Sequence, residues 1–332
     1  MTRALALFSG GLDSILACRV VAAQGITVQA VKFVTPFFGY ELLAKEQEYA
    51  QMVRESYGIE VVLRDVSEPY FTLLRNPPHG YGKNFNPCID CKILLLRAAK
   101  MLMPEFSASF LITGEVIGQR PMSQRRDTLR VIERDSGCDG ILLRPLCAKT
   151  QEPTFAERDG LVDRELLLDF NGRGRQPQIQ LAERFGIKDY PRPAGGCVLT
   201  EPDQAKRIAW YYSRYSKVRL NDIRLLLFGR HFQLPHGGWL VLGRDEAENV
   251  RLEALHDPGD FLVHMPERSG PMGVLHSEHP DDFAAAAGLV VRFGKKTVGE
   301  SAAAAVLFAS GGEEQYLTAE PLADELFQGW GL

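Results

Sequence analysis

Apolar and polar positions alternate in blocks along the first part of the chain. Short apolar runs with the length and composition of buried strands lie at 4–8, 27–34, 60–66, 109–114 and 140–146. Stretches with helical character separate them, at 13–24, 40–57, 89–102 and 121–134. This alternation predicts an α/β fold, a doubly wound parallel sheet that binds its ligand at the carboxyl ends of the strands.

The pattern changes near residue 204. Beyond it, short strand-like pieces separated by Gly/Pro turns lie at 239–243, 261–264, 272–276 and 289–293. A chain of 332 residues is long for one domain. We therefore predict an α/β nucleotide-binding domain over 1–204 and a smaller α+β domain over 205–332. Residues 70–88, rich in Pro, Gly and Asn, predict a long loop.

Composition narrows the class of protein only a little. Hydrophobic residues make up 45% and charged residues 24%, the balance of a globular protein. No apolar run reaches about 18 residues, and the N-terminus enters a strand directly. We expect no membrane span, no signal peptide and a cytoplasmic protein. The net charge of −4 gives no global sign of nucleic-acid binding, so any such surface must be local.

Local clusters of basic residues are candidate RNA contacts. One predicted helix is assigned five arginines: Arg120, Arg125, Arg126, Arg130 and Arg134. The last three share one helix face because of their i, i+4, i+8 spacing. This face is suited to bind a row of phosphates, or it is a solvent-exposed face whose arginines pair with neighbouring acidic side chains. Residues 206–230 interleave basic residues with Trp210, Tyr211, Tyr212 and Tyr215, for base stacking or for an interdomain core. Arg173 and Arg175, set between glycines, are further candidate phosphate contacts.

The most informative segment is SGGLDS at 9–14, directly after the first apolar run. Its two glycines allow a close turn, and the next residues open a helix whose first N–H groups carry partial positive charge. This turn is suited to hold a phosphate, with the hydroxyls of Ser9 and Ser14 as further donors. Asp13 is suited to hold a Mg²⁺ that bridges phosphates. The GKS or GKT ending of P-loop NTPases is missing, which disfavours γ-phosphate transfer.

Three of the six cysteines form a candidate metal or redox set. Cys88 and Cys91 make a CxxC at the start of a predicted helix, which is expected to lower their thiol pKa values, and Cys197 follows two glycines. Three thiolates are one short of a closed zinc site, but suit a 4Fe–4S cluster with one open iron or a two-cysteine sulfur relay. Asp90, inside the CxxC, is a candidate base or a cap or first-turn acid of the helix. The other three are expected to be simply buried: Cys18, Cys138 and Cys147.

These motifs resemble those of a known enzyme group. The segment 9–14 resembles the PP-loop of the ATP pyrophosphatases, which bind ATP and release pyrophosphate. NPCIDCK at 86–92 resembles the cysteine segment of tRNA 2-thiouridylases and of thiouridine synthases that carry an iron–sulfur cluster. TGEVIGQ at 113–119 and the following MSQ at 122–124 are similar to the TGExxGQxxSQ of 4-thiouridine synthases. The segment Gly195-Gly196-Cys197 lies where thiouridylases keep their second cysteine.

The resemblance implies an adenine nucleotide alpha hydrolase-like fold and assigns roles to residues. The residues implied to bind ATP are Ser9, Gly10, Gly11, Asp13, Ser14, Gly114 and Gln119. The residues implied to act in catalysis are Asp13, Cys88, Cys91 and Cys197, the three cysteines also being the implied cluster ligands.

The second domain looks like the RNA-binding module of the NFACT proteins of ribosome quality control. The resemblance is carried by GGWLVLGRD at 237–245, by Glu248 and Asn249, and by DFLVHMP at 260–266. Asp245 and Val250 depart from the family pattern, which has Asn and Asp at these positions.

Together the resemblances imply an ATP-dependent tRNA sulfurtransferase. A uracil oxygen would attack the α-phosphate of ATP, and a sulfur nucleophile would then displace AMP, with 4-thiouridine favoured as product. The implied cofactors are ATP, Mg²⁺ and a 4Fe–4S cluster. The implied partners are tRNA and a sulfur donor, either sulfide or a cysteine desulfurase, with a homodimer allowed.

Three alternatives remain at this point: a tRNA 2-thiouridylase, another PP-loop ligase of the amidotransferase type, and a binding module with a vestigial loop. The intact SGGLDS disfavours the last, and the three placed cysteines disfavour the ligase.

Overall fold

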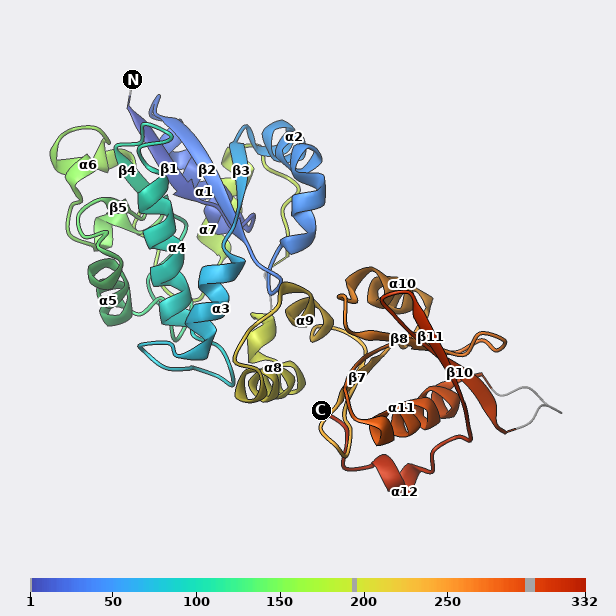
Figure 1. The fold of residues 1–332 in the computed structure, drawn as a ribbon. Helices are drawn as coiled ribbons and strands as arrows, with labels where there is room; N and C mark the ends of the chain where they lie inside the picture. Colours follow the sequence, from blue (N-terminus) through green and yellow to red (C-terminus); the bar gives the residue numbers. More distant parts are fainter. Residues whose placement is uncertain (1, 193–195, 296–301) are drawn as a thin grey trace. The chain divides into compact units, whose positions relative to one another are not determined.

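The structure, a computed structural model, describes residues 2–192, 196–295 and 302–332. The chain divides into two compact units, Met1–Thr200 and Glu201–Leu332 (Figure 1). The predicted boundary after residue 204 lies close to this division. Within the described ranges, no helix combines the length and the apolar content that crossing a bilayer requires.

The first unit is built on a five-stranded parallel sheet in the order β3–β2–β1–β4–β5. Its strands are β1 (Arg3–Leu7), β2 (Thr27–Val34), β3 (Glu60–Asp65), β4 (Phe110–Thr113) and β5 (Leu142–Leu143). The chain runs outward from β1 to β3 and then returns to the other side of β1 as β4, so the strand order reverses at β1. The carboxyl end of β1, where SGGLDS begins, is therefore the place where such sheets bind ligands.

Helices cover both faces of this sheet (Figure 1). In β1, Ala4 and Ala6 belong to the core that includes α1 (Leu12–Ala22), whereas Leu5 belongs to the core that includes α4 (Cys88–Leu102). Successive side chains of a strand point to opposite faces, so a strand buried on both sides must be apolar throughout. This confirms the predicted doubly wound α/β fold.

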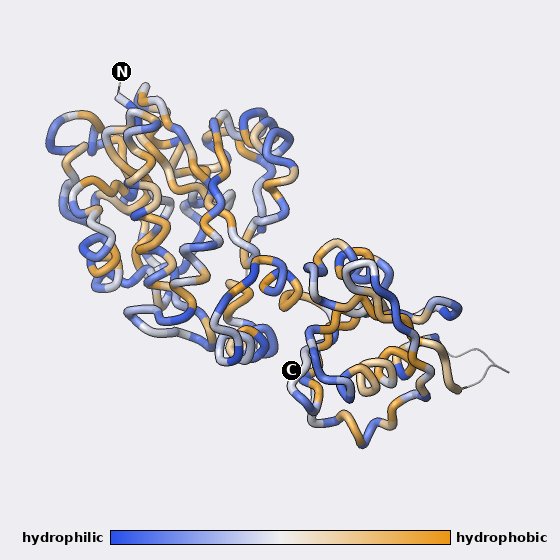
Figure 2. The backbone as a smooth tube through the Cα atoms, viewed as in Figure 1, coloured by the Kyte–Doolittle hydropathy of each residue, from blue (hydrophilic) through white to orange (hydrophobic). Residues whose placement is uncertain are grey.

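The remaining helices of the first unit differ in how deeply they are buried. They are α2 (Glu46–Tyr57), α3 (Ser67–Arg75), α5 (Arg126–Ser136), α6 (Phe155–Arg158) and α7 (Gln176–Arg184). Short 3₁₀ turns are η1 (Tyr40–Lys45), η2 (Ala148–Thr150), η3 (Arg164–Leu166) and η4 (Val198–Thr200). Figure 2 shows apolar residues along the central strands and mainly hydrophilic residues along α2, in which Val53 alone is buried.

Several boundaries differ from those predicted. The expected helix 40–57 begins as the 3₁₀ turn η1, and part of the expected loop 70–88 is α3. In α3, Tyr70, Phe71 and Leu74 are buried at helical spacing. This spacing indicates a helix, but the Pro and Gly residues that follow led to the prediction of a loop over the whole segment. The expected helix 121–134 begins only at Arg126, so Arg120 and Arg125 lie outside it.

The second unit contains a six-stranded antiparallel sheet in the order β11–β10–β8–β9–β7–β6, as the predicted α+β class requires. Its strands are β6 (Arg230–Gln233), β7 (Trp239–Leu242), β8 (Phe261–His264), β9 (Gly273–His276), β10 (Ala304–Ser310) and β11 (Glu313–Ala319). Its helices are α8 (Pro202–Arg214), α9 (Leu220–Leu225), α10 (Glu246–Leu255), α11 (Pro280–Phe293) and α12 (Asp324–Phe327).

One predicted strand of this unit is wrong. Residues 289–293 form the end of α11 and not a strand. Periodicity cannot separate a short apolar run in a strand from one in a buried helix, and here Ala286, Leu289 and Val290 pack with the sheet residues of the same core.

The aromatic residues of 206–230 were considered for base stacking, but the structure packs several of them inside the second unit. Tyr211 is fully buried and stacks on Tyr215, with ring centroids 4.8 Å apart. Trp210 and Tyr211 both pack against Trp239 of β7, at 5.9 and 5.7 Å. The buried ring of Tyr211 therefore stabilises the second unit and is not available to stack on a base.

Candidate active site

The SGGLDS segment forms a tight turn between β1 and α1. Gly10 has φ +85°, a left-handed conformation that glycine adopts without strain, and Gly11 is the extended N-cap residue of α1. The Ser9 hydroxyl accepts a hydrogen bond from the Gly11 N–H (3.2 Å), and the Ser14 hydroxyl donates to the Gly11 carbonyl (2.7 Å). The turn therefore leads into a helix N-terminus, where backbone N–H groups favour an anion.

The TGE segment that follows β4 packs directly against this turn. A Cβ atom on Gly114 would lie only 2.6 Å from the Ser14 backbone nitrogen, so only glycine allows the approach. The structure thereby brings two motifs together that are separated by about a hundred residues of chain.

Asp13 lies among polar side chains from three segments. Gln119 donates an amide hydrogen to Asp13 Oδ2 (2.8 Å), and Arg175 Nη2 lies 3.6 Å from the same oxygen. Asp13 Oδ1 is buried, and no hydrogen-bond partner for it lies within the described part of the chain. A buried carboxylate oxygen with no partner suits a hard cation, so the residues fit the predicted Mg²⁺. Arg175, singled out from the sequence, reaches this site.

Lys32 is a residue of the site that the sequence interpretation missed. It lies on β2 and donates to the Ser9 carbonyl (2.6 Å), with its ammonium 5.7 Å from the ring of Tyr49. Burial lowers the pKa of Lys32, although Glu41 opposes this effect. The available signal would have been that Lys32 is the one charged residue within β2, because a cation is costly to remove from water without a purpose.

The structure connects Cys197 to the loop that precedes the CxxC. Phe85 N–H donates to the Leu199 carbonyl (3.3 Å), and Asn84 Nδ2 donates to the Thr200 carbonyl (2.7 Å). Cys88 and Cys91 begin α4, and the amide of Asn86 donates to the Cys88 sulfur (3.0 Å). Gly195 of the predicted Gly-Gly-Cys motif lies outside the described residues.

The expected lowering of the thiol pKa is wrong for Cys91. Burial raises the pKa of Cys91 to about 12, against a smaller opposing effect of a hydrogen bond with Tyr70. Burial also raises the pKa of Cys197 above its ordinary value. Removal from water outweighs the helix N-terminus, because desolvation disfavours the charged thiolate. Without a metal, both cysteines are therefore protonated at neutral pH.

The three thiols act on one another electrostatically. Charges on Cys88 and Cys197 both raise the pKa of Cys91, and a charge on Cys88 raises that of Cys197. Among the described residues, these three sulfurs do not all lie within 4.8 Å of one another. A four-iron cluster separates its thiolate ligands more widely than one ion does, and it deprotonates the thiols that it binds. Three thiols are the number of ligands that leave one iron of such a cluster open, and they are one short of the four that close a zinc site.

Asp90 makes a contact that the sequence did not predict. It lies in the first turn of α4 but does not cap it; instead it is buried and holds His79. His79 Nδ1 lies 2.7 Å from Asp90 Oδ1, and His79 Nε2 lies 3.0 Å from Asp135. The bond to Asp90 raises the pKa of His79. This histidine thus ties the loop before the CxxC to α4 and α5.

A buried ion-pair network links the start of α4 to the TGE segment. Glu115 pairs with Lys92 and with the buried Arg144, whose Nε lies 3.0 Å from Glu115 Oε2. Burial alone would raise the pKa of Glu115, but the two cations lower it to about 2. Because Lys92 follows Cys91 and Glu115 follows Gly114, this network connects the CxxC to the phosphate turn.

We expect this network to make stability depend on acid pH. Glu115 has a lowered pKa in the folded state, so its contribution is present above its unfolded value of about 4.5 and is lost as the pH falls toward 2. Glu115→Gln should cost about 3–5 kcal/mol at neutral pH, because it removes the carboxylate that pairs with Lys92 and one of the two carboxylates that pair with buried Arg144. It should also weaken the loss of stability between pH 5 and pH 3. Urea unfolding at several pH values measures both effects.

The matched control for this prediction is Glu105→Gln, which removes the exposed partner of Arg64 and should change little. Equal acid dependence in the wild type and in Glu115→Gln would contradict the role of Glu115.

The cysteines outside the set are buried, as expected: Cys18, Cys138 and Cys147.

The sequence of residues 1–155 matches the model of the family described as thiamine biosynthesis protein (ThiI). Residues 229–331 match the model described as NFACT protein RNA binding domain. Both predicted resemblances are thus confirmed, whereas Cys197 and α7 lie between the ThiI segment and the NFACT segment, outside either match.

Relatives of the ThiI segment include a protein named probable tRNA sulfurtransferase from Ureaplasma parvum serovar 3. It is 30% identical over 152 residues, which are 45% of this chain and 38% of that protein. The chain thus spans well under half the length of the curated relatives that it matches.

Solved structures with some likeness include a 4-thiouridine synthetase–RNA complex with bound ATP. It has 22% identity and a TM-score of 0.35, over 56% of this chain and 52% of that one. Another is U34-tRNA thiolase NcsA from Methanococcus maripaludis with its 4Fe–4S cluster. It has 16% identity and a TM-score of 0.33, over 68% and 71% of the two chains.

Proposed function

We propose that this protein is an ATP-dependent tRNA sulfurtransferase that adenylates a uridine and replaces its carbonyl oxygen with sulfur, with 4-thiouridine as the favoured product. The observation that carries the proposal is the chain of contacts from Ser14 through Gly114 and Glu115 to Lys92, next to Cys91. It joins a phosphate-binding turn to a set of coupled thiols. The ThiI match of residues 1–155 supports the same reaction.

In the first step, a uracil oxygen attacks the α-phosphate of ATP and pyrophosphate leaves. The N-terminus of α1 and the hydroxyls of Ser9 and Ser14 receive the departing pyrophosphate, and Lys32 adds a nearby positive charge. Asp13 would hold Mg²⁺ with its unpartnered oxygen, and the metal would offset charge on the phosphates, while Gln119 orients the carboxylate. Adenylation is needed because a free uracil oxygen is a poor leaving group.

In the second step, a sulfur nucleophile displaces AMP. A cluster held by Cys88, Cys91 and Cys197 would supply an open iron site for sulfide. In the competing mechanism one cysteine carries a persulfide and a second resolves it as a disulfide. In both, the thiols are partly buried, and Asn86 and Tyr70 donate hydrogen bonds to sulfur. Three cysteines favour the cluster. Sulfide would supply the sulfur in the cluster mechanism. In the competing mechanism a cysteine desulfurase would transfer sulfur already at the persulfide level, and a thiol reductant would restore the disulfide to two thiols.

We assign catalysis to the domain 1–204 and RNA binding to the domain 205–332. The NFACT match at 229–331 supports an RNA partner for the second domain, which we infer to be the tRNA. We expect the protein to act in the cytoplasm, and a homodimer remains a prediction.

The reaction is tested by incubating the protein with an unmodified tRNA transcript, ATP, Mg²⁺ and sulfide without oxygen. Mass spectrometry of the nucleosides should then show 4-thiouridine, and pyrophosphate release should depend on the tRNA. The appearance of 2-thiouridine would favour the 2-thiouridylase alternative. Pyrophosphate release that needs ammonia but no RNA would contradict the proposal and favour a PP-loop ligase.

The cluster has its own expected signature. Protein purified without oxygen should be brown, with broad absorbance near ~400 nm. Cys91→Ala should lose this absorbance, whereas Cys138→Ala should keep it, because Cys138 is buried and outside the set. Colourless protein that still thiolates tRNA would favour the persulfide mechanism.

A further inference from the structure

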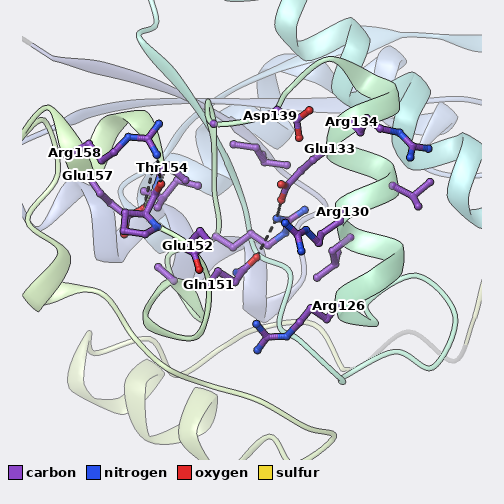
Figure 3. A pocket seen from close by; sticks show the side chains of 18 residues that line it. Arg126, Arg130, Glu133, Arg134, Asp139, Gln151, Glu152, Thr154, Glu157 and Arg158 are labelled. Carbon is purple, nitrogen blue, oxygen red and sulfur yellow. Dashed lines mark hydrogen bonds and ion pairs between the residues drawn. The ribbon is translucent and has the colours of Figure 1, made fainter.

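A cavity in the first unit has no role in the reaction described so far. It has a volume of about 570 Å³ and lies between α5 and the segment 139–158 (Figure 3). This size is in the range of pockets that bind small organic ligands. The cavity does not include the SGGLDS turn or the three thiols among its lining residues.

Buried Arg144 lines the cavity with an unused donor. Its Nε and Nη1 groups bind Glu115, Glu133 and Gln151. Its Nη2 is buried and has no hydrogen-bond partner within the described ranges. A buried guanidinium donor without an acceptor is costly, and native structures rarely leave one unmatched. An acceptor from a ligand in the cavity would satisfy it.

Two exposed arginines of α5 add positive charge at the mouth. Figure 3 shows Arg126 and Arg130 extending from α5 toward the side of the cavity that carries Gln151. No ion pair of either is found in the described part of the chain. Arg134, third in the predicted stripe, also lines the cavity, but its guanidinium extends away from Arg126 and Arg130 in Figure 3 and pairs with Asp135 (2.6 Å). The stripe is thus divided, and two of its members face the cavity.

The acidic residues of the wall offset this positive charge only in part. Glu133 is paired with Arg144, and Glu157 is paired with Arg164. Asp139 lies at the opposite end of the cavity from Arg126 (Figure 3), which leaves exposed Glu152 as the nearer acid.

We propose that this cavity binds a phosphorylated nucleotide unit of an RNA strand. Arg126 and Arg130 would contact two successive backbone phosphates, and Arg144 Nη2 would donate to an acceptor deeper in the cavity. Residues at i and i+4 are about 6 Å apart along a helix, similar to the spacing of phosphates along an extended strand. Guanidinium groups match phosphate oxygens with paired donors. A free mononucleotide has one such group and would leave one arginine unused.

The proposal rests on the proposed function, because it takes RNA as the substrate, and it is tested by binding alone. The full chain is titrated with an unmodified tRNA transcript, without ATP, at salt concentrations from 50 to 200 mM, a range over which phosphate contacts weaken strongly. The double variant R126Q/R130Q should bind at least ~5-fold more weakly at low salt. The slope of log K against log salt should become shallower by about 1.5, the effect of two lost contacts.

The matched control is R54Q/R125Q, which removes two arginines from exposed ion pairs with Glu60 and Asp127 outside the cavity. It should leave affinity and slope close to the wild type. Thermal melting of both doubles checks that they fold, since all four side chains are exposed.

Equal affinity and slope in the two doubles would overturn the proposal. So would a loss of affinity for uridine monophosphate with unchanged affinity for tRNA, which would make a free nucleotide the ligand. If the wild type makes no thiouridine while R126Q/R130Q still loses tRNA affinity, the cavity proposal stands and the proposed function fails. If thiolation proceeds while the doubles bind alike, only the cavity proposal fails.

Discussion

Replacing Cys197 with alanine should reduce sulfur transfer by at least ~10²-fold, the scale of losing a group that acts at the reacting centre. It should leave tRNA-dependent pyrophosphate release within about twofold of the wild type. The two steps separate because adenylation uses the turn 9–14, Asp13 and Lys32, and the described contacts of Cys197 involve none of them. Thiouridine by mass spectrometry and released pyrophosphate, measured in one reaction, give both rates.

Cys138→Ala is the control, because this thiol is buried in the apolar core beside α4 and carries no proposed chemistry. It should leave both steps near the wild type. If Cys197→Ala lowers pyrophosphate release as much as thiolation, the cysteine supports the fold or the nucleotide site and does not deliver sulfur. Full thiolation by Cys197→Ala would remove it from both proposed sulfur mechanisms.

Gly114→Ala should lower both steps together, by at least ~10-fold, and also reduce stability by about 1–3 kcal/mol. The added methyl group would meet the backbone of Asp13 and Ser14, which cannot move aside as a flexible side chain can. The start of α1 must then shift, and with it the phosphate turn and the Asp13 carboxylate. Pyrophosphate release, thiolation and urea unfolding measure the three effects.

Gly174→Ala is the matched control, because a Cβ at Gly174 meets no atom within 4 Å and its backbone needs no left-handed conformation. It should change stability little. Normal pyrophosphate release by Gly114→Ala would show that the TGE segment does not support the nucleotide site. The contact between Gly114 and the Ser14 backbone would then no longer support the proposed function.

The cysteine chemistry shows where sequence reasoning was incomplete. The CxxC at a helix start was visible in the sequence, and so was its position beside a loop. The expected low thiol pKa was wrong for Cys91, because its burial depends on α3 and on Tyr70, which approach from another part of the chain. Likewise, Arg126 and Arg130 were recognised as members of one helical face, but only the packing of α5 against the segment 139–158 shows that they border a cavity.

The sequence by itself determined the parts of this protein that depend on neighbouring residues. These are the Gly10–Gly11 turn into α1, the alternation of apolar strands and helices, and the CxxC at the start of α4. A turn or a helix start is decided by residues within a few positions, so its pattern can be recognised along the chain. Only the tertiary structure decided which residues surround these features. Lys32 reaches Ser9, and Glu115 binds Lys92 and Arg144, because β2, β4 and β5 take particular places in the sheet. Those contacts follow from long-range packing of apolar faces, which no local pattern encodes.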